Sequence, residues 1–253
     1  MKYEKELESA LAAARDAGVI QMKMRGSIGE IARKGDDSPV TAVDRRCEEA
    51  IRRRLLGDFH EDAFLGEESG ATQGSSGRRW IVDPLDGTRP YIRGIPTHSA
   101  LVALEDGEGP AVGVIHLPAL GETYWALRGG GAYLNGEKIS VSGVASLDRA
   151  MGSFLGLIEE FGSPEADSLL RIMQALDYTY GFMDAYSYGS LACGRIDVAV
   201  NLLDKAWDCA AGALIVSEAG GRFSDIKGEP TVHSGNILLS NGLLHEDLLR
   251  FFA

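Results

Sequence analysis

Apolar residues recur at every third or fourth position near the start of the chain, the spacing of an amphipathic helix. The positions that repeat in this way are Leu7, Leu11, Ala14 and Gly18, and then Val43, Cys47, Ile51 and Leu55. A polar stretch over residues 33–38 separates the two groups, so we predict two helices. Thr41 followed by Asp44 is typical of a helix start, and Gly57 of a helix end. Asp44 is therefore predicted in the first turn of the second helix.

The pattern changes to short apolar runs after residue 64, and these runs indicate strands. The runs cover residues 80–82, 99–104, 112–117 and 123–127, with turn residues between them, as in an antiparallel meander. After residue 150, helices and strands alternate. We expect helices at 164–176, 185–193 and 207–219, strands at 196–200 and 237–240, and a last helix that runs to Phe251.

These elements predict a protein of the α+β or α/β class with two halves. Residues 1–142 would form a subdomain of helices and an antiparallel sheet, and residues 143–253 an α/β subdomain. No stretch between them is rich enough in proline or serine to act as a linker. We therefore expect one continuous unit with a site in the cleft between the halves.

The charge balance excludes some partners. The chain has 37 acidic and 25 basic residues, a net charge of −12, which disfavours nucleic acid and anionic membranes because both need a basic surface. No apolar run approaches the roughly 18 residues of a membrane span, and the first residues lack the apolar core of a signal peptide. We expect a cytoplasmic protein. The cysteines, at positions 47, 193 and 209, show no zinc or disulfide spacing.

Three segments place acidic residues where chemistry could occur. An apolar strand runs directly into Asp83, Pro84 and Asp86, followed by a Gly87-Thr88 pair. Proline fixes its own φ angle, so both carboxylates would project from the strand end in a set geometry. An acidic surface turn is the alternative explanation for this segment alone.

The other two acidic segments have ordinary explanations when each is taken alone. Glu67 and Glu68 follow a strand-like run and could form a solvated rim, and Asp208 begins a helix that it could simply cap. If these acids converge with Asp44, charges about 5 Å apart repel by about 3 kcal/mol at an effective dielectric constant near 20. A cation must then compensate them, and oxygen ligands favour Mg²⁺.

The three acidic segments together resemble the inositol monophosphatase superfamily of Mg²⁺-dependent phosphomonoesterases. The matching segments are 66–69, 83–88 and 207–212, with Glu218-Ala219-Gly220-Gly221 behind the last, and the resemblance covers essentially the whole chain. It implies a layered αβαβα sandwich, usually dimeric, so a homodimer is expected. It also implies two or three Mg²⁺ ions in each site and hydrolysis of a small phosphorylated metabolite by metal-activated water.

The resemblance also implies a role for each matching position. Glu67, Asp83 and the Leu85 carbonyl would hold one Mg²⁺, and Asp83, Asp86 and Asp208 a second. The catalytic residues would be Asp44, Glu67 and Thr88, with Asp44 and Thr88 orienting and deprotonating the attacking water. The amides of Gly87 and Thr88 would bind the phosphate.

The substrate is predicted less directly. Segments 113–118, 183–188 and 241–245 look more like the histidinol-phosphate phosphatase branch than like inositol-specific members, so histidinol phosphate is slightly favoured. Asp184 and Asn201 are the predicted substrate-binding residues. The alternatives are that Asp184 caps a helix and that Asn201 is an ordinary residue at a strand end. Asn201 stands where both branches usually carry an acid, and an amide cannot neutralise an ammonium group. Lys34 lies in a segment that resembles the family's metal-sensitive loop. The alternative explanation is an ordinary surface lysine.

Other functions therefore stay open at this point. One alternative is an inositol monophosphatase acting on myo-inositol 1-phosphate, or a phosphatase for another sugar phosphate. A second is a non-catalytic metal-binding regulatory protein with the same fold.

Overall fold

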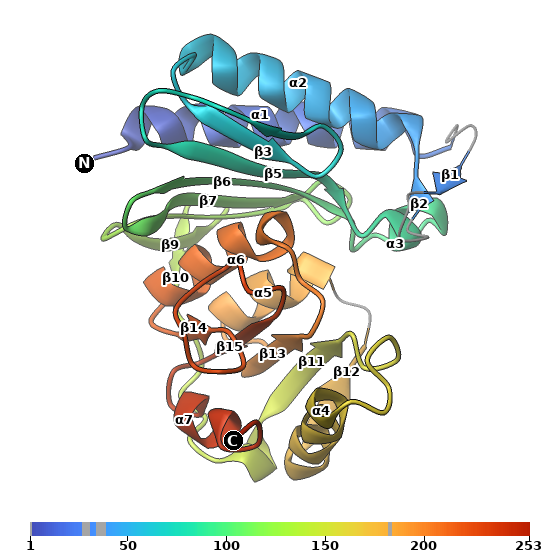
Figure 1. Cartoon of the computed structure of the whole chain (residues 1–253), viewed down its shortest axis with the longest axis vertical. Coiled ribbons are helices and arrows are strands. Elements are labelled where there is room, and N and C mark those ends of the chain that lie inside the picture. Colours follow the sequence, from blue (N-terminus) through green and yellow to red (C-terminus); the bar gives the residue numbers. More distant parts are fainter. Residues whose placement is uncertain (1, 27–30, 34–38, 182–183) are drawn as a thin grey trace.

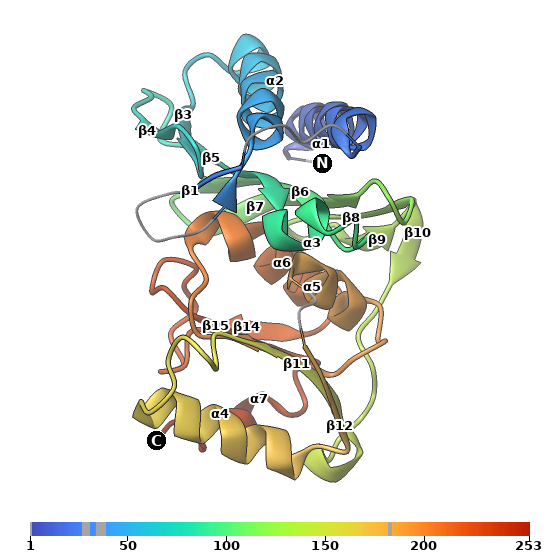
Figure 2. The same cartoon turned by 90° about the vertical axis from the view of Figure 1, so that its right-hand side faces the viewer.

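The computed structural model describes residues 2–26, 31–33, 39–181 and 184–253, and its elements form alternating helical and sheet layers. Figures 1 and 2 show the order: a helical pair, a large sheet, a second helical layer, a smaller sheet, and outer helices. The predicted layered αβαβα sandwich is therefore confirmed. In the described residues no helix is both long enough and apolar enough to cross a membrane.

The first layer consists of α1 (Glu4–Met24) and α2 (Ala42–Asp58), the two helices predicted from the apolar spacing. Their apolar faces pack on one another and on the large sheet. Half of the buried residues of α1 are alanines, including Ala10, Ala13 and Ala17, and such small side chains let the helix lie close to the strands.

The large sheet is eight-stranded, in the order β10-β9-β8-β7-β6-β5-β3-β4. Its strands are β3 (Ala63–Gly66), β4 (Gly70–Thr72), β5 (Arg79–Asp86), β6 (Ser99–Asp106), β7 (Gly109–Leu117), β8 (Glu122–Leu127), β9 (Gly131–Leu134) and β10 (Glu137–Ile139). From β5 to β10 the neighbours are antiparallel, which confirms the predicted meander, whereas β3 runs parallel to β5. The helix α3 (Thr88–Ile92) follows β5, and β1 (Ala32–Arg33) pairs with β2 (Pro39–Val40).

The second half contains a mixed five-stranded sheet in the order β12-β11-β13-β15-β14. Its strands are β11 (Met151–Leu155), β12 (Tyr178–Tyr180), β13 (Val198–Asn201), β14 (Arg222–Ser224) and β15 (Ile237–Ser240). The helices α5 (Asp184–Ala192) and α6 (Ala206–Glu218) lie between the two sheets. On the far side are α4 (Pro164–Ala175) and α7 (His245–Leu249), and a short 3₁₀ turn, η1 (Leu147–Arg149), precedes β11. The predicted subdivision at residue 143 stays a prediction.

Close backbone contact fixes α6 against the large sheet. A Cβ atom added to Gly113 of β7 would lie 2.7 Å from the carbonyl oxygen of Ala211, which is too close for any side chain. A Cβ on Gly212 would likewise lie 2.6 Å from the ring of Tyr188 on α5. Helix α6 therefore sits at a set depth on the sheet, and its first turn, with Asp208, is held beside the end of β5.

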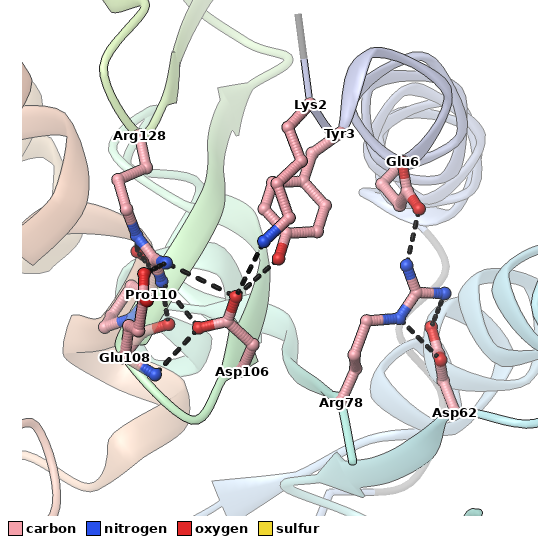
Figure 3. A network of polar contacts seen from close by, with 10 residues as sticks. Lys2, Tyr3, Glu6, Asp62, Arg78, Asp106, Glu108, Pro110 and Arg128 are labelled. Atoms are coloured by element: carbon pink, nitrogen blue, oxygen red, sulfur yellow. Dashed lines mark hydrogen bonds and ion pairs between the residues drawn. The ribbon is translucent and has the colours of Figure 1, made fainter. Parts of the chain in front are cut away.

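A polar network joins the start of α1 to the large sheet (Figure 3). Asp106 accepts hydrogen bonds from Tyr3 and from Arg128, the latter at 2.9 Å. Arg78 pairs with Glu6 at 2.6 Å and with Asp62 at 2.9 Å, and the Asp62 side chain is buried. These partners lie far apart in the sequence, so the network anchors α1 to the layer that carries β5.

Candidate active site

A cavity of about 520 Å³ opens where the end of β5 faces α5, β13 and α6. Residues from both halves of the chain line it. The lining includes nearly all the predicted site residues, namely Glu67, Asp83, Leu85, Asp86, Gly87, Thr88, Asp184, Asn201 and Asp208. The structure thus brings together, around one cavity, segments that are up to about 140 positions apart.

The end of β5 has the irregular geometry that its proline predicts. The pairing of β5 with β6 shifts register between Asp83 and Asp86, because Pro84 has no N–H to donate to the ladder. The Leu85 N–H turns back to donate to Asp83 Oδ1 at 2.9 Å. Asp86 Oδ2 accepts from the Ser99 hydroxyl at 2.8 Å. Both carboxylates are held at the cavity wall and are only 3% and 8% exposed.

Asp44 lies behind the cavity wall and reaches it through Thr88. Thr41 caps α2, and its N–H and hydroxyl donate to Asp44 Oδ2 at 2.8 Å and 2.6 Å. The other oxygen, Asp44 Oδ1, lies 3.1 Å from the Thr88 hydroxyl, which is also 3.0 Å from the Leu85 carbonyl oxygen. One hydroxyl proton serves one acceptor at a time, so Thr88 has two alternative partners here.

Two further acids complete the wall from other elements. Asp208 is in the first turn of α6, where its carboxylate accepts from the Lys205 N–H at 2.6 Å. Glu67 follows β3, and the next residue, Glu68, donates its N–H to the buried carboxylate of Glu48 at 2.8 Å. Glu48 lies one turn after Asp44 on α2, so α2 positions this loop as well as Asp44.

The electrostatics of this wall call for an added positive charge. Burial raises the pKa of Asp83 well above its usual range, and the negative charges of Glu67, Asp86 and Asp208 raise it further. Burial also raises the pKa of Asp86 well above its usual range. A cation among these oxygens would remove the repulsion, and carboxylate and carbonyl oxygens suit Mg²⁺. The donor set therefore fits the predicted ion.

The acids nevertheless do not form a finished metal centre. Among the described residues, no three acidic, histidine or cysteine side chains are arranged as a metal-binding cluster. The ligand roles of Glu67, Asp83, Leu85, Asp86 and Asp208 stay predictions, as do those of the other site residues. Lys34 lies outside the residues that the structure describes.

The two predicted substrate-binding residues lie on the cavity side formed by the second half. Asp184 begins α5 with a positive φ of 39°, and burial raises its pKa to about 6, although Arg89 counteracts this. Its Oδ2 atom is buried with no hydrogen-bond partner in the described structure and would lie 3.1 Å from a Cβ on Gly87. Asn201, at the end of β13, donates its side-chain amide to Asp204.

Sequence reasoning missed four residues with polar or charged side chains that also line the cavity. These are Arg89, Glu159, Tyr188 and Asp204. The available signal for Asp204 was an acid just after the apolar 196–200 run and four positions before Asp208. Tyr188 ends the 183–188 segment that looks like the histidinol-phosphate phosphatase branch, but its spacing does not mark it as a cavity residue, because it reaches the cavity through the packing of α5 on α6.

This fold and cavity occur in a chain whose relatives are named as phosphatases, which are phosphoric monoester hydrolases. The model of the inositol monophosphatase family matches residues 2–252, and the chain belongs to that family.

Particular relatives carry several names. The chain is 37% identical to a histidinol-phosphatase of Chlorobaculum parvum, over 93% of this chain and 91% of that protein. It is 35% identical to a fructose-1,6-bisphosphatase/inositol-1-monophosphatase of Aquifex aeolicus, over 98% and 95%. In structure it resembles the extragenic suppressor protein suhB of Bartonella henselae, with a TM-score of 0.92, 29% identity and 98% of each chain covered.

Proposed function

We propose that this phosphatase hydrolyses histidinol phosphate and uses Mg²⁺ to do so. The observation that carries the proposal is the single cavity in which four acids from three separate segments meet the Gly87-Thr88 turn. A histidinol-phosphatase is among the relatives with the higher identity, at 37%. Myo-inositol 1-phosphate is the second candidate substrate, since a relative 35% identical carries inositol-1-monophosphatase in its name.

The chain's own residues would orient the attacking water and bind the phosphate. With the Thr88 hydroxyl donating to Asp44 Oδ1, the Thr88 oxygen keeps a lone pair that can accept a hydrogen bond from the attacking water. As the water gives its proton to Thr88, Thr88 can pass its own hydroxyl proton to Asp44. The Thr41 contacts fix the other Asp44 oxygen, so this acceptor is already oriented before substrate arrives. The amides of Gly87 and Thr88 would bind the phosphate oxygens.

The wall acids would hold the ions. Glu67, Asp83, Asp86, Asp208 and the Leu85 carbonyl are the proposed ligands, and Asp83 would serve both ions. When bound, Mg²⁺ would supply positive charge to the attacking water and to the leaving oxygen.

A substrate panel tests this proposal. Purified protein with millimolar Mg²⁺ is given L-histidinol phosphate, myo-inositol 1-phosphate, fructose 1,6-bisphosphate or p-nitrophenyl phosphate, and released phosphate is measured. We expect the highest kcat/KM with L-histidinol phosphate and none without a divalent ion. An Asp86→Asn preparation, purified in parallel, controls for contaminating phosphatases. A preference for the inositol ester would select the second candidate, and no release from any substrate would support a non-catalytic regulatory protein instead.

The homodimer and the cytoplasmic location also stay proposals. Light scattering coupled to size-exclusion chromatography would measure the mass in solution and test the first.

A further inference from the structure

Asp204 is a buried acid of the cavity that neither the fold nor the proposed chemistry uses. It lies in the loop between β13 and α6 and is 3% exposed. Its Oδ2 atom accepts a hydrogen bond from the Tyr188 hydroxyl, and its Oδ1 atom accepts one from the Asn201 side-chain amide. No ligand role was predicted for it.

The fold supplies no positive charge to balance this carboxylate. Burying an unpaired carboxylate costs several kcal/mol, so a structural acid normally caps a helix or pairs with a basic side chain. Asp204 does neither within the described residues, because α6 is capped by Asp208 instead. Burial raises the pKa of Asp204 well above its usual range, and the charged groups that raise it further, Asp208, Asp86 and Asp184, are all acids. A nearby positive charge would favour the ionised form.

The charges of the whole cavity lead to the same requirement. Among the described residues, seven carboxylates and one basic side chain, that of Arg89, line the cavity. Two divalent ions would balance the four wall acids if the proposed function holds, and the present inference rests on that function. The acids left over come from the second half of the chain: Glu159 is exposed to solvent, the charge of Arg89 acts on Asp184, and Asp204 is buried. Since the phosphate brings further negative charge, a positive charge on the organic part of the substrate would balance Asp204.

We propose that Asp204 is the specificity-determining residue that binds the ammonium group of an amine-bearing phosphate ester. Each carboxylate oxygen has two lone pairs, and Tyr188 and Asn201 use one on each oxygen. The remaining pairs accept the donors of an ammonium group. Two neutral hydrogen bonds hold the carboxylate in place without cancelling its charge.

Asn201 is then a positioning residue. Its side-chain oxygen accepts from the Leu203 N–H at 3.0 Å while its amide holds Asp204, so both ends of the side chain are used within the loop. The chain thus has a neutral side chain at Asn201, and the negative charge lies three positions further along, at Asp204. The absent acid at position 201 is no obstacle to an amine-bearing substrate.

The experiment compares two substrates on matched variants. Asp204→Asn keeps the shape and removes the charge, and Glu159→Gln makes the same change at the exposed rim of the cavity. For Asp204→Asn we expect kcat/KM with L-histidinol phosphate to fall about 10- to 100-fold, mainly through KM. With p-nitrophenyl phosphate, which has no amine, the change should stay within about threefold. Glu159→Gln should change both by less than about threefold, because solvent screens an exposed charge.

Two further measurements separate the possible failures. Tyr188→Phe should shift KM in the same substrate-dependent direction by less than Asp204→Asn does. Calorimetry should show that L-histidinol, which lacks phosphate, binds wild type but binds Asp204→Asn at least about tenfold more weakly. If Asp204→Asn lowers the activity on both substrates equally, or leaves L-histidinol binding unchanged, the inference is wrong. If wild type releases phosphate from no substrate, the proposed function fails, and the calorimetric comparison still decides the role of Asp204.

Discussion

Gln21 of α1 anchors the loop that carries the cavity acids, so its replacement tests how the fold supports the site. The side chain is fully buried. Its Nε2 atom donates to the carbonyl oxygens of Pro84 at 2.9 Å and of Ser99 at 3.0 Å. Its Oε1 atom lies 2.9 Å from His98 Nδ1. Gln21→Leu would keep most of the volume and remove all three contacts.

The expected cost follows from the groups left without partners. Two carbonyl oxygens and one ring nitrogen would be buried and unsatisfied, each costing about 1–3 kcal/mol. The leucine recovers about 1 kcal/mol by adding apolar burial. We therefore expect the free energy of unfolding to fall by about 2–8 kcal/mol. Each kcal/mol should lower Tm by about 2–4 °C for a chain of this size. The freed Pro84 carbonyl should also loosen Asp83 and Asp86, lowering kcat at temperatures where the variant is folded.

Urea unfolding and phosphate release measure the two effects on one preparation. Lys23→Ala, an exposed change on the same helix, is the control and should stay within about 0.5 kcal/mol of wild type. A Gln21→Leu variant that loses less than about 1 kcal/mol would refute the reasoning, because the three buried groups would then have found other partners.

Other consequences can be checked separately. Thr88→Val should lower kcat about 100-fold or more and Thr88→Ser far less, because only a hydroxyl can bridge to Asp44; steady-state kinetics measures both. Asp86→Asn should abolish phosphate release. The metal-free variant should be at least as stable as wild type, because burial already raises the pKa of Asp86 and so disfavours its charged form. A lower free energy of unfolding for the variant in urea with EDTA would contradict this. Burial lowers the pKa of His98 and His245 to about 4, whereas an unfolded histidine titrates near 6.5. The free energy that these neutral histidines contribute to folding should be full above about pH 6.5 and decline as the pH falls toward 4. In His245→Asn the free energy of unfolding should decline less steeply over this range. Unfolding at a series of pH values measures both.

The sequence predicted the elements with long or strongly periodic patterns and missed several of the short ones. The helices α1 and α2 and the meander from β5 to β8 each have enough residues for their apolar spacing to be visible. β11, β12 and β14 were not predicted, because they lack the continuous aliphatic run that marks β13 and β15, which are as short. They exist because neighbours bury them: β11 pairs with both β12 and β13. These pairings depend on tertiary structure and cannot be predicted from local sequence.

The candidate site divides in the same way. The Asp83–Thr88 motif lies on one continuous segment, so its chemistry could be predicted from local spacing. The surroundings of the substrate's organic part could not, since Tyr188 and Asp204 come together only when α5 packs on α6. The predicted Asn201 contact illustrates the limit: from the sequence, the missing acid there counted against an ammonium-bearing substrate, whereas the structure places Asp204 within hydrogen-bonding distance of that same amide.

This division has a physical reason. The wall acids lie on elements whose relative depth is fixed by backbone contact, at Gly113 against Ala211, so the distance from Asp208 to the end of β5 cannot change without moving a helix. The acids of the organic end lie in a loop and on the first turn of α5, where a substitution moves charge by a few ångströms without disturbing that contact. A change in this loop could therefore alter which alcohol the site accepts while leaving the acids around the end of β5 in place. Under the proposal above, the carboxylate that selects the alcohol in this chain would be Asp204, and the substrate would be a phosphate ester with an ammonium group on its organic part.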